Sequence, residues 1–249
     1  MNKINYLRKI SESEKPFIIY KSDKGFDLYT DFSKKIILTN NNIQNFINKA
    51  TQFKSKRKET DLFIGFFGYE VLNDLIGIKI KKQKSLKFPK GIFYKPETKI
   101  KLQNKLDYKN LELINSKKSF KISMNKASYK IIFDKFKKKI KSGETYQIKI
   151  CTKYSNKSEI DALDFFCRLV KTNMAPEAFM IKDKDYSIIS CSPENLITKK
   201  NDLITTKPIA GTLKKNKSLN KIKALAFFRK NLKETKEHNM IVDMERNDL

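Results

Sequence analysis

The sequence is poor in the side chains that build metal sites and covalent catalysts. It has one histidine, His238, in 249 residues, which excludes a site built from several histidines. No Gly-x-Ser-x-Gly elbow is present, which argues against a Ser-His-Asp triad. The three cysteines, Cys151, Cys167 and Cys191, lie far apart and form no Cys-x-x-Cys pair. Neither a disulfide framework nor a zinc site is therefore expected.

Long apolar runs are also missing. The longest, such as Leu62–Phe67, fall far short of the roughly 20 residues that a helix needs to cross a bilayer. No basic and apolar signal peptide opens the chain. No Walker loop or Gly-x-Gly-x-x-Gly sequence indicates a nucleotide cofactor. We therefore expect a cytoplasmic protein that does not associate with a membrane.

Positive charge is abundant, with 54 Lys and Arg against 27 Asp and Glu and a net charge of +27. The lysines recur as pairs along the whole chain, and Asn and Ile are frequent too, which indicates a compositional bias and a lysine-rich surface. Such a surface would help to attract an anionic substrate. The alternative is a non-catalytic, basic protein that binds RNA, for which we would expect steeply salt-dependent binding. Our prediction is that nucleic acid is not the partner.

The apolar periodicity predicts an α+β fold of helices and mostly antiparallel strands. Short polar turns separate the later strands, so neighbouring strands should pair antiparallel. The polar stretch 102–121 reads as a linker or loose hairpin. Strands are predicted at Phe17–Tyr20, Lys35–Leu38, Leu62–Gly68, Tyr146–Lys153, Ala178–Lys182, Tyr186–Cys191, Leu196–Lys199 and Leu203–Thr206. Tyr69 and Glu70 should open a helix after the third of these strands. Helices are predicted around Ile43–Ile47, over Tyr129–Ile140, after a Ser158 cap to Val170, and over Leu219–Leu232 and Leu232–Asp248.

Two clusters of small, polar and acidic residues stand out near the end of the chain. The first, Lys207–Thr212 (KPIAGT), follows the last predicted strand and should form a tight loop. Gly211 permits a backbone conformation or a close approach that a side chain would block. Thr212 adds a hydroxyl and a backbone N–H, an arrangement that suits the binding of an anionic oxygen.

The second cluster, KEHNMIVDMERNDL, lies in the last predicted helix. Helical spacing places Glu237, Ile241, Met244 and Asp248 on one stripe, with a carboxylate at each end of an apolar centre. Periodicity alone is equally compatible with a half-buried helix that carries charges at its edges.

Together the clusters resemble the paired signature of the chorismate-utilising enzymes, which include component I of anthranilate synthase and of aminodeoxychorismate synthase. Upstream matches are GETYQIKICTKYS (Gly143–Ser155), NMAPEAFMI (Asn173–Ile181) and SCSPENLI (Ser190–Ile197), and Leu62–Glu70 resembles the family's GY(E/D) segment. The resemblance implies the family's fold of two facing sheets wrapped by helices. It also implies that residues 1–115 form the N-terminal region, and that residues 116–249 form the first half of the chorismate-binding domain.

The resemblance also implies a ligand set. Chorismate would be held with Mg²⁺, and Glu237 would be the carboxylate on the metal side. Ala210, Gly211 and Thr212 would line the substrate pocket, and Thr212, Glu237 and His238 would be the catalytic residues. Asp243 and Arg246 would support the helix or the pocket, and a structural ion pair is the alternative for those two.

Ala210 bears on the nucleophile. A subgroup of aminodeoxychorismate synthases has lysine at this position and uses its amine, whereas the methyl group of Ala210 cannot attack. The resemblance therefore implies ammonia, delivered by a glutamine amidotransferase partner. The absence of an LLES-like segment and the sequence VDMERNDL favour aminodeoxychorismate over anthranilate as the product. An isochorismate or salicylate synthase, with water as the nucleophile and Lys149 as a candidate base, remains an alternative.

Family members continue beyond RNDL with a glycine-rich segment and an E-x-x-RG-x-Y-x-G motif that supplies further substrate and metal ligands. Neither occurs before Leu249. We therefore expect either a partial sequence or a broken gene product, and we expect that residues 1–249 do not turn over chorismate alone.

Overall fold

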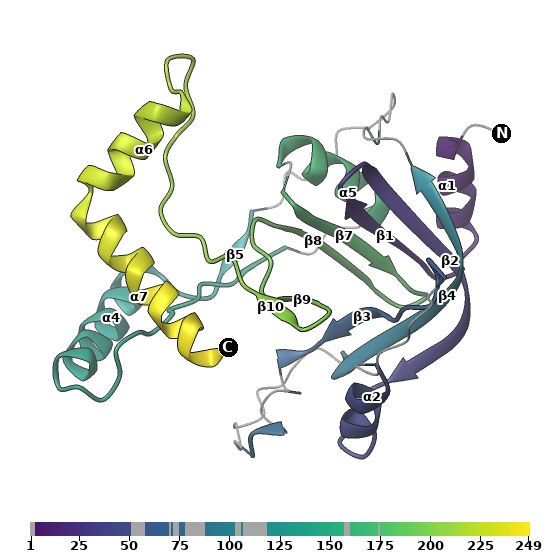
Figure 1. Cartoon of the computed structure of the whole chain (residues 1–249), viewed down its shortest axis with the longest axis horizontal. Helices are drawn as coiled ribbons and strands as arrows, with labels where there is room; N and C mark the ends of the chain where they lie inside the picture. The colour runs from purple at the N-terminus through teal and green to yellow at the C-terminus, as the bar shows by residue number, and fades with distance from the viewer. Residues whose placement is uncertain are drawn as a thin grey trace. The chain divides into compact units, whose positions relative to one another are not determined.

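The computed structural model describes residues 3–50, 58–69, 71, 75–77, 88–102, 106, 119–156, 160–173 and 175–249 (Figure 1). Six strands form one sheet in the order β3-β4-β2-β1-β7-β8, and every neighbouring pair is antiparallel. These strands are β1 (Phe17–Ser22), β2 (Gly25–Ile37), β3 (Ile64–Phe67), β4 (Gly91–Leu102), β7 (Glu177–Lys182) and β8 (Ser187–Ser192).

Two short ladders and the helices complete the described structure. The ladders pair β5 (Lys121–Ile122) with β6 (Tyr154–Ser155), and β9 (Thr198–Lys200) with β10 (Leu203–Thr205). The helices are α1 (Lys3–Glu12), α2 (Ile43–Ala50), α4 (Lys126–Lys141), α5 (Ala162–Thr172), α6 (Lys221–Lys230) and α7 (Leu232–Asp248). Among the described residues, no helix has the length and apolar character needed to span a membrane.

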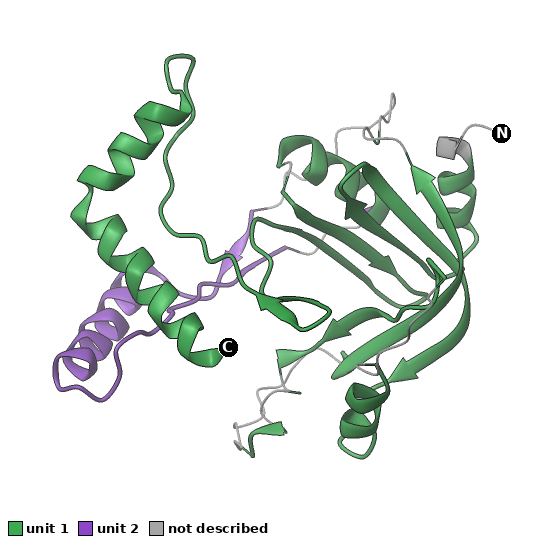
Figure 2. Ribbon diagram, viewed as in Figure 1, with its two compact units in different colours: residues 1–109, 162–249 green, residues 110–161 purple. Residues whose placement is uncertain are grey.

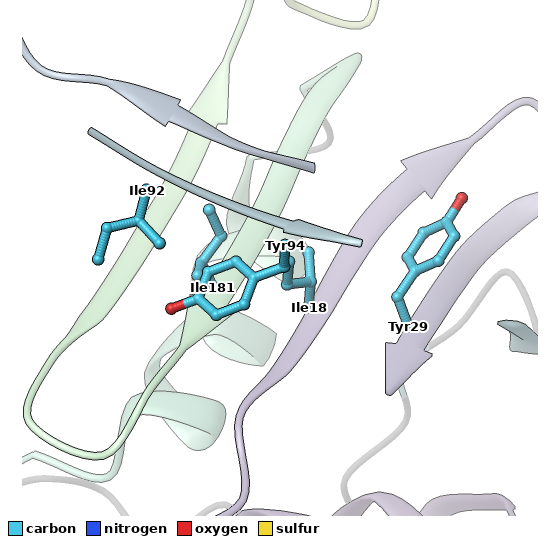
Figure 3. Packing of buried hydrophobic residues seen from close by; sticks show 5 residues of the cluster. All are labelled: Ile18, Tyr29, Ile92, Tyr94 and Ile181. Carbon is cyan, nitrogen blue, oxygen red and sulfur yellow. The ribbon is translucent and has the colours of Figure 1, made fainter. Parts of the chain in front are cut away.

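The core lies on both faces of the six-stranded sheet. Phe17, Ile18 and Ile19 are consecutive in β1 and none is more than 1% exposed, although successive side chains of a strand point to opposite faces. On one face Ile18 packs with Tyr29, Ile92, Tyr94 and Ile181 (Figure 3). The other face is covered by α5, whose buried side chains recur at helical spacing: Leu163, Phe166, Cys167 and Val170.

Tyr94 of the cluster in Figure 3 is hydrogen-bonded to the carboxylate of Asp183. The Asp183 carboxylate, at the end of β7, accepts hydrogen bonds from the Tyr94 hydroxyl, from Lys35 Nζ at 2.5 Å and from the Lys184 N–H at 2.7 Å. Burial alone would raise the pKa of Asp183, but these bonds and the Lys35 charge outweigh it and hold the pKa below its usual value. Burial also raises the pKa of Tyr186, a further donor to Asp183, to about 12. The carboxylate is therefore a charged acceptor that ties β4 to the β7–β8 hairpin.

The sheet crosses the boundary that the sequence placed near residue 115. Strand β1 pairs with β7, so that Phe17 lies opposite Lys182 and Tyr20 opposite Phe179. The structure divides into a larger compact unit of residues 1–109 and 162–249 and a smaller one of residues 110–161 (Figure 2). The larger unit contains strands from both predicted regions.

Burial is uneven within the larger unit. Residues 184–249 are all described, and none of their side chains is buried. The last buried positions along the chain are Met180, Ile181 and Asp183 of β7 and its turn. Strands β9 and β10 and helices α6 and α7 therefore follow the core rather than form part of it.

Most predicted elements are confirmed, among them the α+β class with antiparallel sheets, the strand at Phe17–Tyr20, the helix over Tyr129–Ile140 and the helix Leu232–Asp248. The predicted strand Tyr146–Lys153 is wrong, because these residues have no regular secondary structure. Alternation of side chains does not make a strand unless the backbone finds a ladder partner, and only Tyr154 and Ser155 pair, with Ile122 and Lys121. The predicted Ser158 cap and Glu70 lie outside the described residues, as does most of the 102–121 stretch.

The Asp183 cluster predicts how stability depends on pH. Asp183→Asn should lower the free energy of unfolding by about 2 kcal/mol at pH 7, since it removes a charged acceptor of several hydrogen bonds. Because the folded pKa is depressed, this contribution is present above the ordinary carboxyl pKa and is lost as pH falls below about 4. Urea unfolding between pH 7 and pH 3 measures both effects. Asp185→Asn, an exposed change in the same turn, is the matched control, and an equal loss in both variants would contradict the assignment.

Candidate functional site

The segment Lys207–Thr212 has no regular secondary structure and leaves β10 directly. Gly211 has φ +77°, and a Cβ built there would lie 2.6 Å from Phe228 Cε1 and 2.7 Å from Glu234 Oε2. Both the backbone conformation and the contact with the α6–α7 junction therefore require glycine. The prediction that Gly211 serves a close backbone approach is confirmed.

A second contact joins the start of this segment to the far end of α7. The Thr206 hydroxyl lies 2.6 Å from Glu245 Oε2. From Glu234 to Glu245 is eleven residues, which rise about 16 Å along a helix. From Thr206 to Gly211 is five residues, which span about 17 Å when fully extended. The segment is therefore long enough to reach both contacts. It runs in the opposite direction to α7, because Thr206 meets the end of the helix and Gly211 meets its start.

The face of α7 that meets the segment follows from these contacts. Glu234, His238, Ile241 and Glu245 are spaced by four, three and four residues, so they share one face, and all four are half-buried. His238 and Ile241 therefore lie on the face of α7 that carries both contacts, between Glu234 and Glu245. Ala210 is half-buried, whereas Thr212 is exposed.

Glu237 occupies a different position. It lies about 100° around the helix from His238 and is exposed, as is Asp248 at the other end of the predicted stripe. Asp243 and Arg246 form an ion pair with each other, with side chains 63% and 76% exposed. The pairing matches the structural alternative raised from the sequence for these two residues.

Glu194, of the Ser-Pro-Glu turn, holds the middle of the segment. Its Oε1 accepts a hydrogen bond from the Ile209 backbone N–H at 2.8 Å, and Glu194 is half-buried. The sequence indicated this turn as a motif but gave Glu194 no role, because the contact joins residues fifteen positions apart. Only the fold of β8, β9 and β10 brings them together.

The neighbouring Asn195 ties the same turn to the sheet. Its Nδ2 donates to Glu177 Oε1 at 3.2 Å, and Tyr20 donates to Glu177 Oε2 at 2.5 Å. Burial, and then the bond to Glu177, raise the pKa of Tyr20, so its hydroxyl remains a neutral donor. The turn that holds the segment is thus anchored to β1 and β7.

The fit of Mg²⁺ can be judged from the donors. Among the described residues, no group of three or more His, Cys, Asp or Glu side chains is placed to hold a metal ion. Mg²⁺ keeps several waters and binds one or two carboxylates together with substrate oxygens. The exposed carboxylate of Glu237 fits as one such ligand. The described residues do not form a full protein cage, which this ion does not need.

The candidate site combines the irregular segment with one face of α7. An exposed hydroxyl at Thr212 follows a left-handed glycine, and a half-buried imidazole faces the same segment from α7. The class of protein is thus an α+β protein with an antiparallel sheet and an irregular segment that contacts a helix.

The family model for "chorismate binding enzyme" matches residues 11–249. The chain belongs to this family. The model covers both signature clusters and the six-stranded sheet.

Individual relatives support this assignment. The chain is 34% identical over 132 residues to aminodeoxychorismate synthase component 1 of Bacillus subtilis, a match that covers 53% of this chain and 28% of the relative. It is 33% identical over 165 residues to anthranilate synthase component 1 of Buchnera aphidicola subsp. Pemphigus spyrothecae, covering 61% and 31%. An anthranilate synthase component I-like protein of Synechocystis is 27% identical over 213 residues, covering 75% and 44%. The chain thus spans less than half the length of these relatives.

The crystal structure of anthranilate synthase component I from Streptococcus pneumoniae has the same fold. Its TM-score to this chain is 0.66 at 20% identity, and the match covers 93% of this chain and 59% of that one. The expected fold class is therefore confirmed.

Two glycines with the same backbone conformation test the contact at Gly211. Gly143 has φ +75° with nothing within 4 Å of a built Cβ, whereas Gly211 has φ +77° and close contacts. Gly143→Ala should cost about 1 kcal/mol of unfolding free energy from the backbone alone. Gly211→Ala should cost about 1–3 kcal/mol more, because Phe228 and Glu234 must move. Urea unfolding compares the two, and equal costs would show that the segment does not press on α7.

Proposed function

We propose that this chain contributes to a chorismate-aminating synthase, with ammonia as the nucleophile and anthranilate or 4-amino-4-deoxychorismate as the product. The observation that carries the proposal is a pair of contacts between α7 and the PIAGT segment (Pro208–Thr212) or the residues just before it. Gly211 lies against Glu234, and Thr206 binds Glu245. Each contact joins one signature to a residue just before the other: Glu234 precedes KEHNMIVDMERNDL, and Thr206 precedes PIAGT. The two signatures, about two dozen residues apart, are therefore neighbours in this proposal.

The residues of the segment have distinct roles in this proposal. The N–H and hydroxyl of Thr212, beside Gly211, bind a carboxylate of chorismate, since charge-assisted hydrogen bonds of this kind are short and strong. His238, on the facing side of α7, is placed to donate to or accept from the same substrate. Glu237 binds Mg²⁺, which when present neutralises a substrate carboxylate.

Ala210 supports ammonia as the nucleophile. It is half-buried in the segment and carries only a methyl group, and Lys207 lies three residues earlier and is exposed. No side-chain amine in the segment replaces the one that the lysine subgroup uses at position 210. Ammonia then attacks C2 with loss of the 4-hydroxyl group, or attacks C4 in the equivalent displacement. A glutamine amidotransferase subunit is the proposed source of ammonia.

The product places the protein in one of two biosynthetic routes. Loss of pyruvate after amination at C2 gives anthranilate, the precursor of tryptophan. Amination at C4 gives a precursor of 4-aminobenzoate and folate, the product that VDMERNDL favours. Release of isochorismate without ammonium would instead support the water-using alternative with Lys149 as base. Lys149 is exposed in the smaller compact unit.

The first test is binding. The purified protein should bind chorismate in the presence of Mg²⁺, measured by calorimetry. Thr212→Val should weaken this binding about ten- to a hundredfold, the effect of losing a hydrogen bond to a charged group. The control is Thr172→Val in α5, whose hydroxyl bonds the Arg168 carbonyl and lies outside the site. Equal binding by both variants, or no binding by the unaltered protein, would contradict the proposal.

The second test is turnover. Chorismate, Mg²⁺ and an ammonium salt should give an aminated product, identified by mass spectrometry, when the protein is assayed with its amidotransferase and any further chain that completes the synthase. The position of the amino group distinguishes the two products. Isochorismate as the sole product would overturn amination.

A further inference from the structure

We propose that Glu245 and Thr206 are positioning residues, which hold α7 in the rotation that turns His238 toward the PIAGT segment. This inference deepens the proposed function and gives the site one more requirement. Both residues are half-buried, and Thr206 directly precedes the segment. Their hydrogen bond of 2.6 Å has a carboxylate as acceptor, which makes it stronger than a bond between neutral groups.

The Thr206 hydroxyl has two acceptors within reach. Besides Glu245 Oε2 at 2.6 Å, the carbonyl oxygen of Leu196 lies at 3.0 Å. One hydroxyl carries one proton, so the closer, charged acceptor takes the larger share. Thr206 therefore connects the end of α7 to the chain that leaves the Ser-Pro-Glu turn, where Glu194 binds the Ile209 N–H.

The two ends of α7 contribute differently. At Gly211 the contact is packing against Phe228 and Glu234, which limits approach but not rotation of the helix. At Glu245 the contact is a directed hydrogen bond. A helix rotates by about 100° per residue, so a rotation of that size would replace His238 on this face by Glu237 or Asn239. The helix is held at two points along its axis, and one of these contacts is a hydrogen bond with a fixed direction. Together they fix which face of α7 meets the segment.

The cation next to Glu245 in the sequence does not compete with Thr206 for the Glu245 carboxylate. The adjacent cation, Arg246, bonds Asp243 on the exposed side of the same helix. Asp243 therefore provides a matched control, because it is a carboxylate two residues away that makes no contact with Thr206 in the described structure.

His238 is the only histidine of the chain, so its ring C–H resonances in an NMR spectrum are unambiguous. Glu245→Ala and Thr206→Val should each shift these resonances, and the double variant should shift them no further than the larger single effect. Each should also speed modification of His238 by diethyl pyrocarbonate about threefold or more, since the reagent samples the open form. Asp243→Ala should change neither readout. Glu245→Gln, which retains an acceptor, should restore much of the resonance position.

Circular dichroism of each variant confirms that the fold is retained, and Glu245→Gln serves as the test variant should Glu245→Ala not fold. Unchanged His238 resonances in a folded Glu245→Ala variant, or an equal shift in Asp243→Ala, would overturn the inference.

These readouts need no substrate, so they separate the two proposals. If His238 responds to Glu245 while the unaltered protein does not bind chorismate, the positioning role stands and the proposed function fails. If chorismate binds and His238 does not respond, the proposed function stands and the positioning role fails. If both proposals hold, loss of the Glu245–Thr206 bond should lower kcat more than it raises KM. The reason is that Thr212 and Gly211, which bind the substrate in this proposal, are unchanged.

Discussion

The antiparallel pairing of β1 with β7 is the interaction on which the rest of the structure depends. It joins residues near position 18 to residues near position 181, and both strands lie in the interior of the six-stranded sheet. Each side of this pair carries a hairpin, β1–β2 on one side and β7–β8 on the other. Closing so long a loop costs entropy, which the buried Ile18 and Ile181 and their neighbours offset. Without this pair the Ser-Pro-Glu turn after β8 would have no fixed support.

A series of hydrogen bonds connects the candidate site to the paired strands β1 and β7. Glu177 in β7 accepts from Tyr20 in β1 and from Asn195 in the turn. The adjacent Glu194 fixes Ile209 of the segment, and the segment meets α7. The site is thus set by polar contacts that begin at the edge of the core and extend outward from it.

Residues with strong local signals could be predicted from the sequence alone. A short continuous apolar run located β1, the absence of Gly and Pro located α7, and Gly211 indicated an unusual backbone conformation. What could not be predicted depends on partners distant in the chain. Tyr146–Lys153 alternates as a strand does but finds no ladder, and the role of Glu194 exists only after β9 and β10 have turned back. The pairing of β1 with β7 across the predicted boundary near residue 115 was not predicted either, because no local pattern reports which strand a strand will join.

The lack of any buried side chain in residues 184–249 has a consequence for how this site would bind. Local opening of such a segment costs less free energy than unfolding of the sheet, so α6, α7 and the loop should exchange their amide hydrogens sooner than β1 or β7. A ligand held between the PIAGT segment and α7 would supply contacts that the segment lacks, and part of its binding energy would be spent on ordering. Ligand binding and local folding would then be coupled in a single equilibrium. The bound anion would provide the contacts that buried side chains provide elsewhere in the fold.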